Sequence, residues 1–309
     1  MIAEDSNIIY VGCYYRSLLI EFNNDTLCIK GKTNMNIIIN QIRSFNRRRL
    51  TRRHLKKASV ITPFGFKFFG PNTMQNGNFE ATETKILIKL FSQADIFVNV
   101  GANFGYYICM ARNMCVRSIA IEPIPINQNI LKRNLIENNW DQNVILHSVA
   151  CGNSDENITI YGEGTGASII KGWAQNPSRL KHVVPMKKLD NILSNEKVTT
   201  KSVILIDVEG FEFDVLHGAQ NMLGSKDKPV IMLESGLTDH RAEGGLNLNF
   251  LEIFKFIIKN GYRVFSVEDI NFEITQELIK KNIEQNKDQL GTHNFLLIPD
   301  SFDFSILTD

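Results

Sequence analysis

Residues 96–107 read IFVNVGANFGYY, a strand-length apolar run that leads into two glycines, Gly101 and Gly105, and then into a helix. Glycine at such a turn lets the backbone bend sharply and lets a ligand approach without meeting a Cβ atom. The stretch therefore predicts a buried strand whose carboxyl end forms part of a ligand site.

Downstream of residue 60 the chain alternates between short β-branched runs and amphipathic helical stretches, which is typical of βαβ units and predicts a parallel sheet. The expected strands are Ile96–Val100, Ser118–Glu122, Val144–Val149, Val203–Asp207, Val230–Glu234, Tyr262–Val267 and Phe295–Ile298. The expected helices are Phe104–Arg112, Pro125–Asn139, Phe211–Leu223 and Asn249–Asn260. Pro125 suits a first helical turn, and Gly261 suits the stop after the last helix.

Residues 151–193 break this alternation, because several glycines separate short β-like pieces. Enzymes of the α/β class commonly keep substrate loops in such excursions. Ser168 is the candidate substrate contact in this segment. A second candidate is His240, in the polar loop GLTDHRAEGG (residues 236–245) that follows the fifth expected strand.

The strand after the glycine turn ends in Glu122, which follows Gly101 by about 20 residues. At this spacing a carboxylate reaches the hydroxyls of a ribose bound across the first loop, which indicates an adenosine ligand. A dinucleotide site would show GxGxxG, whereas this loop reads GANFG, with Asn103 in place of the second glycine. A ligand without phosphates fits better, which disfavours a nicotinamide-dependent oxidoreductase. S-adenosylmethionine is such a ligand, and the order of features resembles class I methyltransferases.

A second cluster, VILIDVEGFEFDVLHGA at residues 203–219, combines a buried strand, two acids and the start of a helix. The carboxyl ends of central strands face the ligand crevice in open α/β sheets, so we expect Asp207 and Glu209 near the reacting group. Glu212 and Asp214 have a simpler explanation, because the helix dipole favours acids in the first turn.

Seven pieces of the chain, taken together and in order, resemble the FkbM-type methyltransferases. They are GNFEATE (77–83), VNVGANFGYY (98–107), IAIEPIPINQNILKRNLIENN (119–139), VACG (149–152), VPMKKLDNIL (184–193), IDVEGFEFDVLHGA (206–219) and IMLES (231–235). These S-adenosylmethionine-dependent enzymes are mostly associated with O-methylation of sugars and other hydroxylated natural products. The resemblance implies an α/β, class I (Rossmann-like) methyltransferase fold: seven strands, mostly parallel, with the last antiparallel.

The resemblance also implies roles for individual residues. The methionine part of the cofactor is expected beside Asn99, Gly101, Ala102, Asn103 and Gly105, its ribose beside Glu122, its adenine beside Ala150, and the transferred methyl beside Asp207 and Glu209. The family usually has Asp at the position of Asn99, where the acid helps to hold the cofactor's ammonium group. We assign Asp207 to positioning and Glu209 to accepting the proton of the acceptor hydroxyl.

No metal is expected, because no two histidines have the spacing of a metal pair and the cysteines lack CxxC spacing. A competing arrangement has Asp207 and Glu209 holding a divalent cation that binds the acceptor's hydroxyls, but spacing offers no third ligand.

Residues 1–60 lie outside the resemblance and are expected to form an extension to the methyltransferase domain of residues 61–309. Seven Lys/Arg and no acid occur between Arg47 and Lys57, at the end of a basic amphipathic helix expected over residues 35–57. This helix either covers acidic surface or holds a polyanion such as a nucleic acid, an acidic glycan or a lipid surface. A degenerate methyltransferase-fold binding protein that uses this helix is the alternative to an enzyme.

The composition excludes two other classes of protein. With 309 residues, 43% hydrophobic and 22% charged, and 34 Lys+Arg against 33 Asp+Glu, the chain is neither disordered nor strongly charged. No apolar run approaches the roughly 18 residues that cross a bilayer. The apolar stretch Ile8–Tyr15 follows two acids instead of the positive leader of a signal peptide, so we expect a cytoplasmic protein.

Overall fold

A computed structural model describes residues 58–173, 180–238, 246–247 and 249–308, together with the backbone of three strands nearer the N-terminus. The chain divides into two compact units, Met1–Arg43 and Ser44–Asp309. In the first unit, β1 (Ile8–Val11), β2 (Leu18–Asn23) and β3 (Thr26–Lys30) form an antiparallel sheet in that order. The basic helix expected over residues 35–57 lies outside the described residues.

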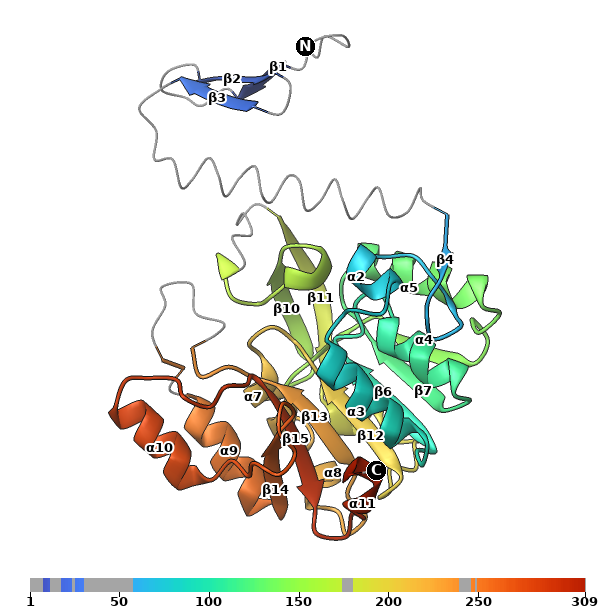
Figure 1. The fold of residues 1–309 in the computed structure, drawn as a ribbon, viewed down its shortest axis with the longest axis vertical. Helices are drawn as coiled ribbons and strands as arrows, with labels where there is room; N and C mark the ends of the chain where they lie inside the picture. The colour runs from blue at the N-terminus through green and yellow to red at the C-terminus, as the bar shows by residue number, and fades with distance from the viewer. Residues whose placement is uncertain are drawn as a thin grey trace. The chain divides into compact units, whose positions relative to one another are not determined.

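The second unit is built on the seven-stranded, mostly parallel sheet that the sequence predicts (Figure 1). Its strands, in spatial order, are β14 (Tyr262–Ser266), β15 (Asn294–Pro299), β13 (Val230–Glu234), β12 (Ser202–Ile206), β6 (Ile96–Val100), β7 (Arg117–Ile121) and β8 (Val144–His147). Only β15 runs antiparallel to its neighbours in this sheet. The fold is therefore that of a class I methyltransferase.

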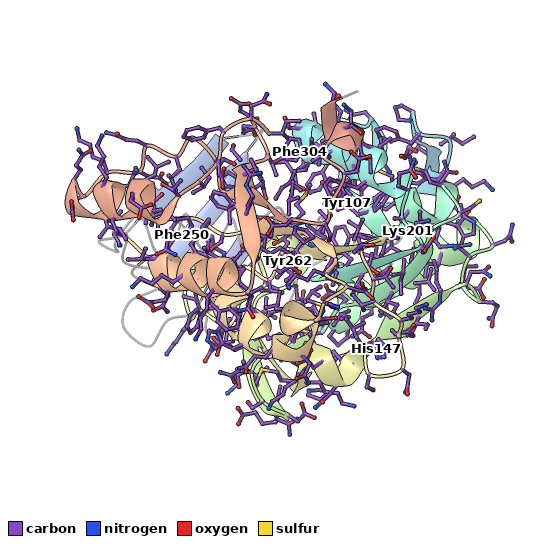
Figure 2. The ribbon with its side chains drawn as sticks, turned by 90° about the horizontal axis from the view of Figure 1, so that it is seen from below. Tyr107, His147, Lys201, Phe250, Tyr262 and Phe304 are labelled. Carbon is purple, nitrogen blue, oxygen red and sulfur yellow. The ribbon has the colours of Figure 1, made fainter. Side chains whose placement is uncertain are left out.

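Helices cover both faces of the sheet and bury two separate cores. Alternation along β6 turns Phe97 toward α3 (Ala81–Phe91), α4 (Tyr106–Asn113) and α5 (Pro125–Glu137), and turns Val98 toward the other face. There, α7 (Glu212–His217), α8 (Gln220–Gly224), α9 (Asn249–Lys259) and α10 (Gln276–Glu284) complete the second core. Figure 2 labels Tyr107 and Phe250, which belong to the first and second core respectively.

Five further elements in the described part of this unit are short. They are β4 (Val60–Ile61), β5 (Lys67–Phe68), α2 (Asn72–Gln75), α6 (Leu189–Ile192) and α11 (Ser305–Thr308). Within the described ranges, no helix has the length and apolar character needed to cross a bilayer.

The expected helix over residues 211–223 is in fact two helices, α7 and α8, and this expectation was wrong. The break falls at Gly218, where a Cβ atom would lie 1.9 Å from the carbonyl oxygen of Gly152. The break therefore falls where the backbone of Gly152, from an earlier part of the chain, packs against Gly218, and local sequence does not reveal this contact.

The segment that breaks the alternation forms a small second sheet. Its strands are β10 (Glu156–Tyr161), β11 (Lys181–Lys187) and β9 (Ala150–Cys151), in that order, and the short helix η1 (Gly164–Gly166) follows β10. We call residues 152–188 the excursion. Buried residues of the excursion form a small core with Ile124. The excursion therefore lies beside the carboxyl end of β7.

Candidate active site

A cleft with about 620 Å³ of empty space, including its open mouth, lies at the carboxyl ends of β6, β7 and β12. Seven of the residues expected from the sequence line the cleft: Gly101, Asn103, Glu122, Ala150, Ser168, Asp207 and Glu209. Asn99, Ala102 and Gly105 do not line it, and His240 lies outside the described residues.

The turn after β6 has the conformation for which its glycines are needed. Gly101 and Gly105 have φ angles of 89° and 81°, in the left-handed region that residues with a Cβ rarely adopt. The N–H groups of Gly101 and Ala102 both donate to the carbonyl of Ile121, at 2.9 and 3.0 Å. The turn is therefore fixed against the end of β7, beside Glu122.

Glu122 lies one residue beyond β7 and is 3% exposed. Its two carboxylate oxygens accept the backbone N–H groups of Asn103 and Ile124, both at 2.8 Å. Burial raises the pKa of Glu122 to about 7, although these donors act to lower it. The Glu122 carboxylate, which lines the cleft, is thus held rigidly by backbone groups.

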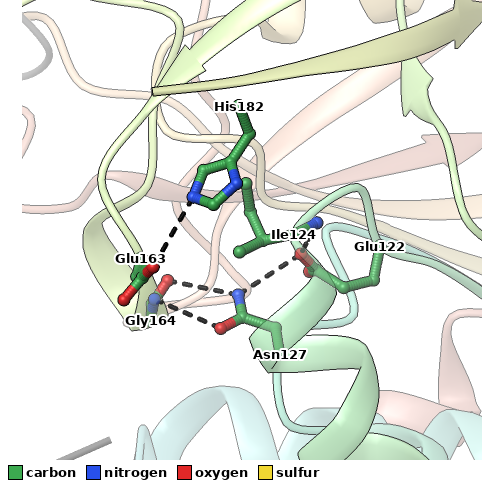
Figure 3. A network of polar contacts seen from close by, with 6 residues as sticks. All are labelled: Glu122, Ile124, Asn127, Glu163, Gly164 and His182. Carbon is green, nitrogen blue, oxygen red and sulfur yellow. Dashed lines mark hydrogen bonds and ion pairs between the residues drawn. The ribbon is translucent and has the colours of Figure 1, made fainter. Parts of the chain in front are cut away.

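Asn127, in the first turn of α5, links Glu122 to the excursion (Figure 3). Its amide nitrogen donates to Glu122 Oε1 and to the carbonyl of Gly164, both at 3.3 Å, and its amide oxygen accepts the N–H of Gly164 at 3.1 Å. Glu163 next to Gly164 pairs with His182 of β11 at 3.7 Å. Asn127 was not predicted as a site residue, because its only signal in the sequence is a polar side chain in the helical turn that follows Glu122.

Two amide oxygens near the glycine turn are buried without a hydrogen-bond partner, Asn99 Oδ1 and Asn103 Oδ1. Asn99 is 2% exposed and lies opposite Ala120 and Leu205 in the sheet register. Buried polar atoms normally have partners. Two orphaned acceptors where the methionine part of the cofactor is expected therefore fit a ligand that carries N–H donors.

Asp207 lies one residue beyond β12, and its N–H donates to the carbonyl of Val100 at 3.0 Å. Burial, reinforced by the carboxylates of Glu234 and Glu209, holds the pKa of Asp207 well above its usual range. The Asp207 carboxyl group is therefore harder to ionise than that of an exposed aspartate.

Glu209 has a φ angle of 56°, which is rare for a residue other than glycine and is typical of functional sites. Ser168 donates its hydroxyl to the carbonyl oxygen of Glu209 at 2.6 Å, and Trp173 donates its indole N–H to Glu209 Oε2 at 2.7 Å. Both donors come from the excursion. Glu212 is also buried, and its carboxylate accepts the N–H of Gly210 at 2.8 Å, which supports the turn instead of the cleft.

A further acid near the cleft, Glu80, was not predicted as a site residue. It precedes α3 with a φ of 41° and accepts the hydroxyl proton of Tyr107 at 2.6 Å. Burial raises the pKa of Glu80 to about 7, and Glu209 is among the charges that act on it. It lies within GNFEATE, so its place in the resemblance was its only signal. Among the residues that the structure describes, no three His, Cys, Asp or Glu side chains are grouped to hold a metal ion.

The fold is that of a class I methyltransferase, a class of enzymes whose cofactor is S-adenosylmethionine. The sequence profile described as the Methyltransferase FkbM domain matches residues 99–264, which is more than half of the chain. The chain belongs to this family, as the resemblance implied.

Solved structures of similar proteins include an FkbM methyltransferase from Methylobacillus flagellatus KT, at 16% identity and a TM-score of 0.41. That match covers 66% of this chain and 44% of the Methylobacillus chain. Geranyl diphosphate C-methyltransferase from Streptomyces coelicolor A3(2) matches at 13% identity and a TM-score of 0.38, covering 72% of this chain and 76% of its own. No curated protein matches the chain.

Proposed function

We propose that the protein transfers the methyl group of S-adenosylmethionine to a hydroxyl oxygen of a sugar or glycan. The observation that supports this best is the pair of acids, Asp207 and Glu209, which line the same cleft as Glu122. When bound, the cofactor supplies an electrophilic methyl on a sulfonium centre. An alcohol oxygen is a weak nucleophile until its proton has somewhere to go, and a carboxylate meets that need.

The two acids have different tasks in this proposal. Asp207 lines the cleft and is fixed by the backbone hydrogen bond to Val100, so it positions the acceptor or the cofactor. Glu209 accepts the hydroxyl proton. Methyl transfer develops little charge that would need an oxyanion site, so alignment of the reacting atoms is the larger contribution of the protein.

We assign the other residues of the site to different parts of the expected cofactor. Glu122 would accept hydrogen bonds from the ribose hydroxyls. The unpaired oxygen of Asn103 would accept from the ammonium group, and that of Asn99, which does not line the cleft, would act through water. Ala150 is buried beside Ile124 and Ile160, which makes an apolar surface for the adenine.

The test is transfer from S-adenosylmethionine carrying a ¹³C-labelled methyl to glycans and sugars from cells that lack the protein. We expect a product whose labelled carbon has the chemical shift of an O-methyl group. The Glu122→Ala variant serves as the matched control and should give little product. A label bound only to carbon or nitrogen would contradict the proposal. Binding to heparin without any transfer would favour the alternative, a polyanion-binding protein on the same fold.

A further inference from the structure

Glu209 is held in a backbone conformation that the rest of the chain must maintain. Its φ of 56° places it in the left-handed region, and Gly210 follows with a φ of 100°. A non-glycine residue persists there only when its surroundings determine its conformation. The carbonyl of Glu209 accepts the hydroxyl of Ser168 at 2.6 Å, across 41 residues of sequence.

Ser168 is itself fixed on both sides and is 1% exposed. It exchanges two backbone hydrogen bonds with Tyr161 at the end of β10, at 2.7 and 3.0 Å. Its hydroxyl oxygen also accepts the N–H of Ile170 at 3.0 Å. The Ser168 hydroxyl therefore donates its one proton to the backbone carbonyl of Glu209 and accepts one hydrogen bond from Ile170.

Trp173 holds the side chain of the same residue. Its indole N–H donates to Glu209 Oε2 at 2.7 Å, and its backbone N–H donates to the carbonyl of Ile170 at 3.1 Å. One short segment, residues 168–173, thus fixes both the backbone and the carboxylate of Glu209. A hydrogen bond to a charged group is stronger and more directional than one between neutral groups.

We propose that Ser168 and Trp173 are positioning residues for the base of the methyl transfer, and that the excursion sets the direction in which the Glu209 carboxylate points. This inference rests on the proposed function of Glu209. Ser168 then acts through Glu209, and the role in substrate contact expected for it from the sequence is secondary.

A spectroscopic experiment tests the contact without using activity. The chain has two tryptophans, Trp140 and Trp173, so Trp140→Phe leaves Trp173 as the sole indole reporter. In that background we expect Glu209→Gln to change the Trp173 emission, because the charged partner of the indole N–H is lost. Asp214→Asn, which removes a carboxylate bonded to Asn153 outside the cleft, should leave the emission unchanged. An emission that does not respond to Glu209→Gln would overturn the contact.

A kinetic experiment tests the role. Trp173→Phe keeps an aromatic ring and removes the donor, so kcat should fall roughly 10- to 100-fold. Affinity for S-adenosylhomocysteine should stay within about twofold of wild type, because Glu122 and the glycine turn are untouched. Ser168→Ala should show the same separation. A wild-type kcat in Trp173→Phe would overturn this inference but not the proposed function. A wild-type protein that methylates no acceptor would overturn the proposed function. In that case the emission result would still decide whether Trp173 holds Glu209.

Discussion

The carbonyl oxygen of Asp207 lies 1.8 Å from the point that a Cβ atom on Gly101 would occupy. The glycine turn after β6 and the acid after β12 therefore touch through their backbones. This contact brings the cofactor loop and the proposed reacting centre to one point, and only glycine at position 101 permits it.

The first prediction follows from that contact. Gly101→Ala should lower the free energy of unfolding by about 2–5 kcal/mol, because the alanine meets both a backbone oxygen and an unfavourable φ of 89°. Binding of S-adenosylhomocysteine should be lost in whatever protein still folds. Gly224→Ala is the control, since no atom lies within 4 Å of its Cβ position, and it should be neutral or slightly stabilising. Urea denaturation of both variants checks this, and equal stabilities would contradict it.

The second prediction concerns the pH dependence of cofactor binding. Ribose hydroxyls donate to the ionised form of Glu122, whose pKa burial raises to about 7. Affinity for S-adenosylhomocysteine should therefore increase as pH rises through about 7, with release of a proton on binding. Glu122→Ala should weaken binding roughly 10- to 100-fold and abolish the pH dependence. Calorimetry in buffers of different ionisation enthalpy measures both, and an affinity independent of pH in the wild-type protein would remove Glu122 from the ribose site.

The third prediction concerns stability without ligand. Burial raises the pKa values of Glu80 and Glu122 from 4.5 to about 7, so the native state holds more protons than the unfolded state between these values. The free energy of unfolding should therefore fall as pH rises from about 4.5 to 7, by about 1.4 kcal/mol per pH unit for each full proton of difference. Glu122→Gln should reduce this slope in urea titrations. The exposed Glu252, paired with Lys255, offers a control, and Glu252→Gln should keep the wild-type slope.

The fourth prediction concerns Asn99, whose Oδ1 is buried and unpaired. Asn99→Asp restores the acid that the family usually has and adds a charge opposite the cofactor's ammonium group. We expect tighter binding of S-adenosylmethionine together with lower stability of the empty protein, because the new carboxylate is buried without a counterion until the ligand arrives. An unchanged dissociation constant would show that position 99 does not contact the ammonium group.

The sequence predicted the sheet well because its central strands, β6, β12 and β13, are buried on both faces and read as continuous apolar runs. It extended β8 and β14 past their observed ends, to Val149 and Val267, because polarity does not show where sheet pairing ends. For the same reason it extended β7 and β12 by one residue, to Glu122 and Asp207. These two residues lie just beyond β7 and β12, where their side chains turn to the cleft.

The site was predictable only where local spacing carries information. The glycine turn and Glu122 are close in sequence to the strands that place them. Trp173 contacts Glu209 across 36 residues, and Asn127 contacts Gly164 across 37, so no local pattern marks either pair. Glu80 meets Tyr107 through tertiary packing alone, across 27 residues.

The most direct test of the proposed mechanism is the turnover of Glu209→Gln measured beside its affinity for S-adenosylhomocysteine. General-base catalysis contributes about 10²–10⁴-fold, so turnover should fall by that factor while cofactor affinity stays near wild type. Turnover at the wild-type rate would contradict the assignment of Glu209 as the base. Activity that disappears with EDTA and returns with magnesium would contradict it as well, and would assign Asp207 and Glu209 to a metal ion instead.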